Sequence, residues 1–181
     1  MPRRILHLHV SLTGTAPLVW RRLHVPGGYT LDRVHRVLQY ALGWHDCHLH
    51  VFDIDGVQYG QPDPHELLDL CDELDFRLDA VAGEGSRFSY TYDFADWWEH
   101  DIAVEAVRDA APGVRYPLCV DGAHPAPPEE VGGLSGYAEF RAALGDPGHP
   151  RHQEVRDWVG ASYAARRFDA GRVTTLLRRL T

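Results

Sequence analysis

The sequence predicts an α+β fold, and three observations point to it. Residues 5–60 read as β-β-α-β-β, a β-grasp-like start. Residues 87–107 alternate apolar and polar side chains, which predicts a further antiparallel hairpin that extends the sheet. Apolar residues at helical spacing fill the C-terminal third, which we expect to pack on the sheet as helices.

The first strands and helix follow from side-chain periodicity. Residues 5–12 and 18–26 each alternate aliphatic with polar or aromatic side chains, the period of a half-buried strand. Thr30 offers an N-cap oxygen, and apolar residues then recur at helical spacing until a glycine at position 43. The spacing predicts a helix over residues 31–42.

The remaining elements follow in chain order. Residues 48–54 predict a strand that turns at Asp55 and Gly56 into a return strand. The segment from 61 to 86 is mixed: it begins as an acidic loop, and its FRLDAVA stretch is a short strand or a turn. Proline and glycine mark residues 115–133 as an ordered loop. Three helical patterns follow, at 136–145, 150–160 and 169–180, the last with Asp169 as its N-cap.

Length and composition favour one domain. A chain of 181 residues with 44% hydrophobic residues can bury roughly 70% of its unfolded surface. We expect a single domain over residues 1–181, with a mixed sheet and helix core at 1–114, a Pro/Gly-rich loop at 115–136 and a helical tail at 137–181.

Charge and cysteine content narrow the possible partners. The formal net charge is −8, which disfavours non-specific binding of nucleic acid. The three cysteines are odd in number and widely spaced, which favours a reducing compartment over a disulfide framework. No apolar run approaches the roughly 20 residues of a membrane span. We therefore expect a soluble, cytoplasmic protein with no membrane partner.

The segment WHDCHLHVF holds the first group of candidate residues. His45, Cys47, His48 and His50 are ligand types that zinc uses, and residues two apart on a strand share a face. His48 and His50 are therefore candidate metal ligands, with zinc as the candidate cofactor. The alternative is a polar strand face whose histidines bond neighbouring side chains or water.

The segment YDFADWWEHDI holds the second group. Asp93, Asp96, Trp98 and His100 are candidates for ligand binding, and Asp96 and His100 also for metal binding, because a carboxylate beside a histidine can set its tautomer and raise its pKa. In the alternative interpretation, Asp93 caps the turn of the hairpin and the aromatic residues, Trp98 among them, pack in the core.

The segment PLCVDGAHPAPPEEVGG holds the third group, with Cys119 and Glu129 as ligand-binding candidates on a loop stiffened by proline. For Cys119 the alternative is a buried, inert thiol. Since all three segments are rich in ligand-type residues, one hypothesis is that they converge on a single polar cleft.

Five ordered segments of the chain resemble one family. They are PLVWRRLHVP, TLDRVHRVLQYALGW, HLHVFDIDG with Tyr59, FSYTYDFADWWEHDIAVE and PLCVDGAHPAPPEEVGGLSGY. In these the chain is similar to the plasmid pRiA4b ORF-3-like family, some of whose members are labelled passenger TnpR-type proteins of insertion elements. The resemblance implies an α+β fold and, for some members, a mobile-element association. Ala95 stands where the family usually has glycine. If that position requires a positive φ, an alanine there is strained.

Three function hypotheses remain. The first is a non-enzymatic domain that holds a partner protein or small ligand in the loops at 93–100 and 119–133. The second is a metal-dependent enzyme, hydrolase-like, built on the convergent cleft. The third is an accessory factor for nucleic acid, suggested by the mobile-element label. No nucleotide-binding P-loop, nucleophile elbow or HExxH motif is present.

Overall fold

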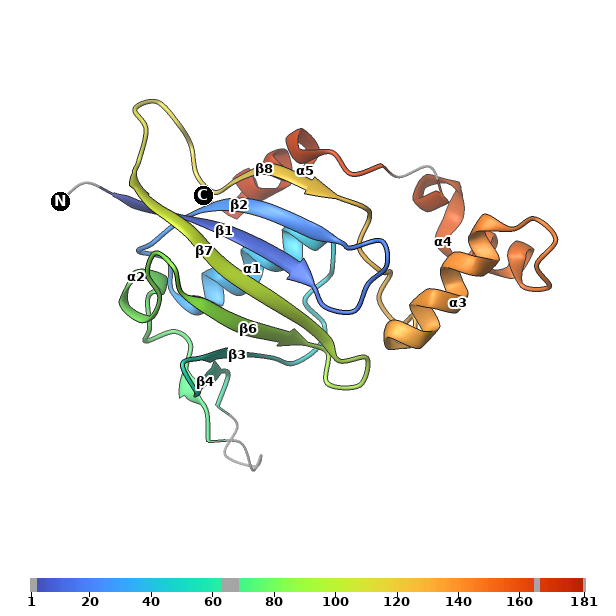
Figure 1. Ribbon diagram of the computed structural model, residues 1–181, viewed down its shortest axis with the longest axis horizontal. Helices are drawn as coiled ribbons and strands as arrows, with labels where there is room; N and C mark the ends of the chain where they lie inside the picture. The colour runs from blue at the N-terminus through green and yellow to red at the C-terminus, as the bar shows by residue number, and fades with distance from the viewer. Residues whose placement is uncertain (1–2, 63–68, 165–166, 181) are drawn as a thin grey trace.

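The computed structural model describes residues 3–62, 69–164 and 167–180, and in them eight strands form one sheet in the order β5-β4-β3-β6-β7-β1-β2-β8. All neighbours pair antiparallel except β4 and β5. The strands are β1 (Arg4–Leu12), β2 (Trp20–Pro26), β3 (His50–Ile54), β4 (Val57–Gly60), β5 (Cys71–Asp72), β6 (Arg87–Tyr92), β7 (Trp98–Asp109) and β8 (Leu118–Ala123). The α+β class predicted from the sequence is confirmed (Figure 1).

Helix α1 (Leu31–Leu42) lies across one face of this sheet (Figure 1). Its bounds are those predicted. Gly43 ends it with a φ of 81°, and the Gly43 N–H donates to the carbonyl of Gln39. Thr30 precedes the helix, but its hydroxyl bonds the Asp32 carboxylate rather than a backbone N–H. The apolar side of α1 and the alternate residues of the strands, such as the fully buried Leu8 and Leu38, form the core. Each such leucine contributes roughly 1.5–3 kcal/mol through burial.

The turn between β6 and β7 depends on Asp93. Asp93 adopts a φ of 59°, and its carboxylate accepts hydrogen bonds from the backbone N–H groups of Ala95 and Asp96. Short polar side chains tolerate this left-handed conformation, so aspartate suits the position. The positive φ angles of this turn belong to Asp93 and Trp97 and not to Ala95, so alanine fits the turn without strain.

Two segments differ from the prediction. Residues 118–123, expected to be loop, form the edge strand β8, because β2 offers an unpaired edge to them. The FRLDAVA stretch, expected to be a strand or turn, contains the one-turn helix α2 (Leu78–Val81). Residues 63–68, part of the predicted acidic loop, lie outside the described residues.

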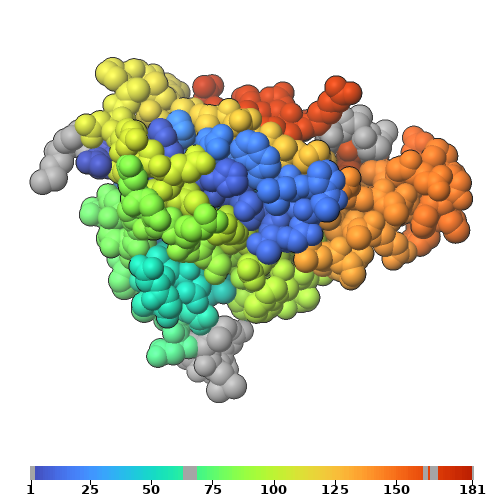
Figure 2. Space-filling model, in the orientation of Figure 1, coloured from blue at the N-terminus to red at the C-terminus, as the bar shows by residue number. Residues whose placement is uncertain are grey.

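The C-terminal third is helical, as predicted, and its helices take two positions. Helices α3 (Gly133–Gly145) and α4 (His152–Ala164) pack on each other and project from one end of the sheet (Figures 1 and 2). Helix α5 (Ala170–Leu177), followed by a short 3₁₀ turn (Arg178–Leu180), returns to pack against β8 and α1. Asp169 caps α5 by accepting a hydrogen bond from the Arg172 N–H at 3.0 Å. Among the described residues, no helix has the length and apolar character to cross a membrane.

Candidate metal centre

Two loops that are distant in sequence meet at one end of the sheet, where β3 begins and β6 ends. One loop, residues 44–49, follows α1, and the other, residues 124–131, follows β8. Trp44 joins them, because its indole N–H donates to the Pro127 carbonyl at 2.9 Å and its ring stacks on Tyr92. A buried tryptophan with a satisfied N–H is a strong anchor, so the relative position of the two loops is well defined.

Three ligand-type side chains converge where these loops meet. The sulfur of Cys47, a ring nitrogen of His48 and a carboxylate oxygen of Glu129 all lie within 4.8 Å of one another. The Cys47 Sγ is 3.5 Å from Glu129 Oε1. Ligand atoms around a tetrahedral zinc ion lie roughly 3.3–3.8 Å apart, given zinc–ligand distances of about 2.0–2.3 Å. Small side-chain movements would therefore bring all three onto one ion.

Glu129 is held in place by several donors. Its Oε1 accepts from the Tyr92 hydroxyl at 2.7 Å, and its Oε2 lies 2.5 Å from His45 Nδ1. Burial alone would raise the pKa of Glu129, but the hydrogen bonds from Tyr92 and His45 outweigh it and hold that pKa below its ordinary value. Glu129 is therefore a carboxylate at neutral pH, the form that binds metal.

His48 is oriented by two carboxylates. Its Nε2 lies 2.9 Å from Glu130 and 3.7 Å from Asp93, the residue that caps the β6–β7 turn. Such carboxylate partners fix the ring orientation and tautomer of a metal-binding histidine. Asp93 and Glu130 have φ angles of 59° and 63°. Non-glycine residues in this region cluster at functional sites.

Cys47 is exposed, and its pKa is raised by partial desolvation and by the nearby Glu129, while the contact with the Tyr92 hydroxyl acts in the opposite direction. Without metal, the side chain is a neutral thiol at pH 7. A bound zinc ion would deprotonate it, because a coordinating thiol loses its proton to the charge of the ion.

The histidines named from the sequence occupy different places. Strand β3 begins at His50, so His48 lies in the preceding loop and the alternation of strand faces does not extend to it. His50 is buried, with Nε2 2.7 Å from Glu73 and its ring stacked on His35 at 3.5 Å. His100 is fully buried on β7, where its Nδ1 donates to the Tyr90 carbonyl at 3.0 Å. Of the three histidines predicted as metal ligands, only His48 belongs to the three-residue cluster, and His45 contacts the cluster through Glu129.

The other candidates from the sequence lie outside the cluster. Asp96 accepts a hydrogen bond from the Gly132 N–H at 3.1 Å and so ties the β6–β7 turn to the start of α3. Trp98 is 1% exposed and packs in the core. Cys119 lies on β8, five strand spacings along the sheet from β3, where its backbone bonds Thr174 and burial raises its pKa to about 11. The three sequence segments thus converge through His48, Asp93 and Glu129.

The sequence places Cys47 in a ligand-rich segment, but the predicted metal ligands of that segment were His48 and His50 and did not include Cys47. The aromatic residues, Tyr92 among them, were assigned to the core. Tyr92 does pack there, yet its hydroxyl reaches out to Cys47 and Glu129. The adjacency of cysteine and histidine at positions 47 and 48 was the signal for the ligand pair. No sequence signal marked the tyrosine hydroxyl.

Comparison with known proteins supports one family for the whole fold. The sequence profile of the plasmid pRiA4b ORF-3-like proteins matches residues 4–172. A protein of Sinorhizobium fredii (strain NBRC 101917 / NGR234), named uncharacterized protein y4hQ, is 41% identical over 167 residues, which cover 90% of this chain and 84% of that protein. The crystal structure of the protein of unknown function MM3350 from Methanosarcina mazei Go1 is similar with a TM-score of 0.86 at 30% identity, covering 94% of this chain and 98% of that one. The chain belongs to the plasmid pRiA4b ORF-3-like family.

Proposed function

We propose that this protein binds a divalent transition-metal ion, best matched by zinc, through Cys47, His48 and Glu129. The observation that carries the proposal is the approach of one sulfur, one imidazole nitrogen and one carboxylate oxygen to within 4.8 Å. Calcium and magnesium prefer oxygen ligands alone, whereas thiolate with imidazole favours zinc. In this proposal the protein is a non-enzymatic binding protein, and the ligand that it binds is the metal ion.

The cluster supplies three protein ligands and one further candidate. The further candidate is His45, whose Nδ1 contacts the second carboxylate oxygen of Glu129. Its side chain is 82% exposed, so it can turn toward an ion without loss of packing. A site with three protein ligands keeps a position open for water or a small molecule. With His45 as the fourth ligand, the site would be closed, as structural zinc sites are.

Zinc titration of chelator-treated protein tests the proposal. We expect one zinc ion per chain, and an affinity at least roughly 100-fold weaker in Cys47→Ser, His48→Gln and Glu129→Gln, because loss of a direct ligand costs more than loss of an outer partner. Cys71→Ser and His149→Gln are matched controls, since these residues lie outside the cluster. Unchanged affinity in the three cluster variants would contradict the proposal.

A metal-dependent, hydrolase-like activity is the second candidate. One observation favours it: Glu129 and His45 also border a cavity, so an ion at the cluster would lie at the rim of a space with the volume of a small-molecule site. Zinc-loaded protein should then hydrolyse activated esters or phosphoesters, and the His48→Gln variant should not. If the protein binds one zinc ion per chain but hydrolyses none of these substrates, the hydrolase hypothesis is wrong and only the metal-binding role remains.

Two arginines of β2 and α1 pair with carboxylates and a third is buried, so these three give the nucleic-acid hypothesis no support. Arg21 is buried, Arg22 pairs with Glu105 at 2.7 Å, and Arg36 pairs with Asp32 at 2.9 Å. Arginines paired in this way offer little free charge to phosphates. We assign no DNA-binding role to this surface.

A further inference from the structure

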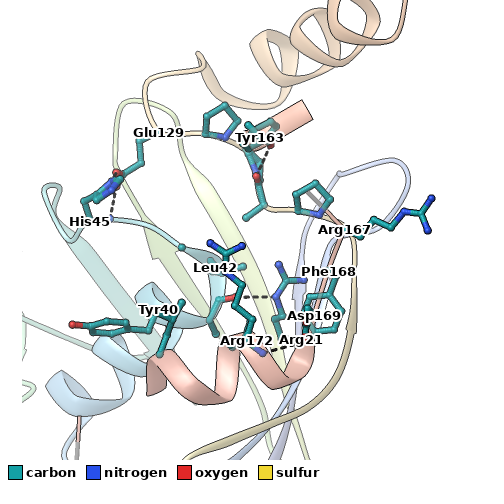
Figure 3. Close-up of a pocket in the computed structure, with 18 residues that line it drawn as sticks. Arg21, Tyr40, Leu42, His45, Glu129, Tyr163, Arg167, Phe168, Asp169 and Arg172 are labelled. Atoms are coloured by element: carbon teal, nitrogen blue, oxygen red, sulfur yellow. Dashed lines mark hydrogen bonds and ion pairs between the residues drawn. The ribbon is translucent and has the colours of Figure 1, made fainter. Parts of the chain in front are cut away.

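A cavity of about 340 Å³ lies between the end of α1, the loop that carries Pro125–Glu129 and the start of α5 (Figure 3). Much of its wall is apolar or aromatic, with Tyr40 and Leu42 from α1, Phe168 before α5 and the prolines of the loop. A mostly apolar space with a few polar groups is the usual form of a small-molecule site. The charged groups of this cavity are separated, with arginines at one end and Glu129 at the other.

Arg21 places a buried positive charge at one end of the cavity. The residue is 3% exposed. Its guanidinium donates to the carbonyls of Ala41, Trp20 and Ala123 at 2.8–3.0 Å and stands 4.5 Å from the ring centroid of Phe168. All these partners are neutral. Burial lowers the pKa of Arg21 to about 10, so the side chain is still a cation at neutral pH.

Arg172 adds a second guanidinium at the same end. Arg172 lines the cavity together with Arg21, while Arg167 is directed away (Figure 3). In the described part of the chain, no ion pair joins Arg21 or Arg172 to a carboxylate. Asp169 also lines the cavity, but its carboxylate accepts the hydrogen bond that caps α5. A desolvated charge without a counter-ion is costly, so an anion here would gain more than at an exposed arginine.

We propose that this cavity binds a small molecule through a carboxylate or phosphate group, held by Arg21 and Arg172, with its apolar body against Tyr40 and the proline loop. The planar fork of a guanidinium matches the oxygens of either anionic group. The site is distinct from the proposed metal ligands, although Glu129 borders both.

The opposite rim sets the specificity. Glu129 is a carboxylate at that end, so it disfavours a second negative charge on the ligand. The volume is near the lower limit of the roughly 300–1,000 Å³ typical of ligand pockets, which suits a body of about one ring. The ligand class is therefore a small aromatic or aliphatic molecule with one anionic end.

Calorimetric titration of metal-free protein with benzoate and with phenyl phosphate tests this inference, with benzyl alcohol as the uncharged probe. At least one of the two anions should bind with one site per chain, and at least about tenfold more tightly than benzyl alcohol. Arg172→Gln should weaken that binding at least about tenfold, and Arg172→Lys should weaken it less, because lysine keeps the charge.

The control variant is Arg156→Gln, which removes the same charge from an exposed position on α4. Arg172 is exposed, so its replacement leaves the core intact. Equal binding by wild type and Arg172→Gln, an equal loss in Arg156→Gln, or binding of benzyl alcohol as tight as that of the anions would overturn the proposal. Because the protein carries no metal in this test, failure of zinc binding does not affect the result.

Discussion

The buried His100 makes the protein sensitive to mild acid, and the size of the effect follows from its surroundings. His100 is fully buried beside Tyr90 and Trp44, and burial lowers its pKa from 6.5 to about 4. The folded protein therefore keeps this imidazole neutral down to about pH 4, whereas the unfolded chain protonates it below about pH 6.5.

The sign follows from proton uptake. Between pH 6.5 and pH 4 the unfolded state binds more protons at this residue, so stability falls as the pH falls. From these two pKa values, His100 lowers the free energy of unfolding by about 2 kcal/mol between pH 7 and pH 5. Other histidines add their own contributions, but those are common to the wild type and a His100 variant.

The variant His100→Asn isolates the contribution. Asparagine does not titrate, and its side-chain amide can still donate to the Tyr90 carbonyl that His100 Nδ1 bonds at 3.0 Å. Urea denaturation at pH 7 and pH 5 should show a stability loss on acidification that is smaller by about 2 kcal/mol in His100→Asn than in wild type. An equal loss in both proteins would refute the argument, whatever the absolute stability of the variant.

Three further predictions concern packing and thiol chemistry. Glu73→Ala should cost about 1–3 kcal/mol in urea denaturation, because it leaves the buried His50 without its hydrogen-bond partner at 2.7 Å, and unchanged stability would contradict this. Gly133→Ala should lower stability by about 1–3 kcal/mol, because Gly133 has a φ of 64° and a Cβ there would stand 2.8 Å from the Asp96 carbonyl oxygen; unchanged melting would count against the contact. In the native protein, iodoacetamide should alkylate the exposed Cys47 and spare the buried Cys119, and zinc should protect Cys47; mass spectrometry of the labelled peptides decides, and equal labelling of the two thiols would be the opposing result.

Sequence periodicity was sufficient to predict an element whose structure depends on its own residues alone. The helix at 31–42 needs only its apolar spacing and Gly43, so its bounds agree with the structure. Strand β8 depends instead on the free edge of β2, with which it pairs. Prolines flank β8 in the sequence, and they indicate a loop. A strand that requires a distant partner has little local signal.

In the candidate site, too, the residue types were predictable from local sequence, whereas their arrangement was not. The ligand-type residues were visible in the sequence, but their grouping depends on Trp44, whose N–H bonds the Pro127 carbonyl 83 positions away. The two-residue alternation linked His48 with His50, and the start of β3 at His50 separates them. Which histidine meets Glu129 is thus decided by loop geometry that a single sequence does not contain.

Titration of the metal-free protein with cobalt(II), followed by absorption spectroscopy, tests the proposed metal centre most directly, because cobalt replaces zinc and reports its ligands. We predict one cobalt per chain, a thiolate-to-cobalt charge-transfer band that disappears in Cys47→Ser, and displacement of the cobalt by zinc. Absence of stoichiometric cobalt, or a band that persists in Cys47→Ser, would contradict a centre built on Cys47, His48 and Glu129.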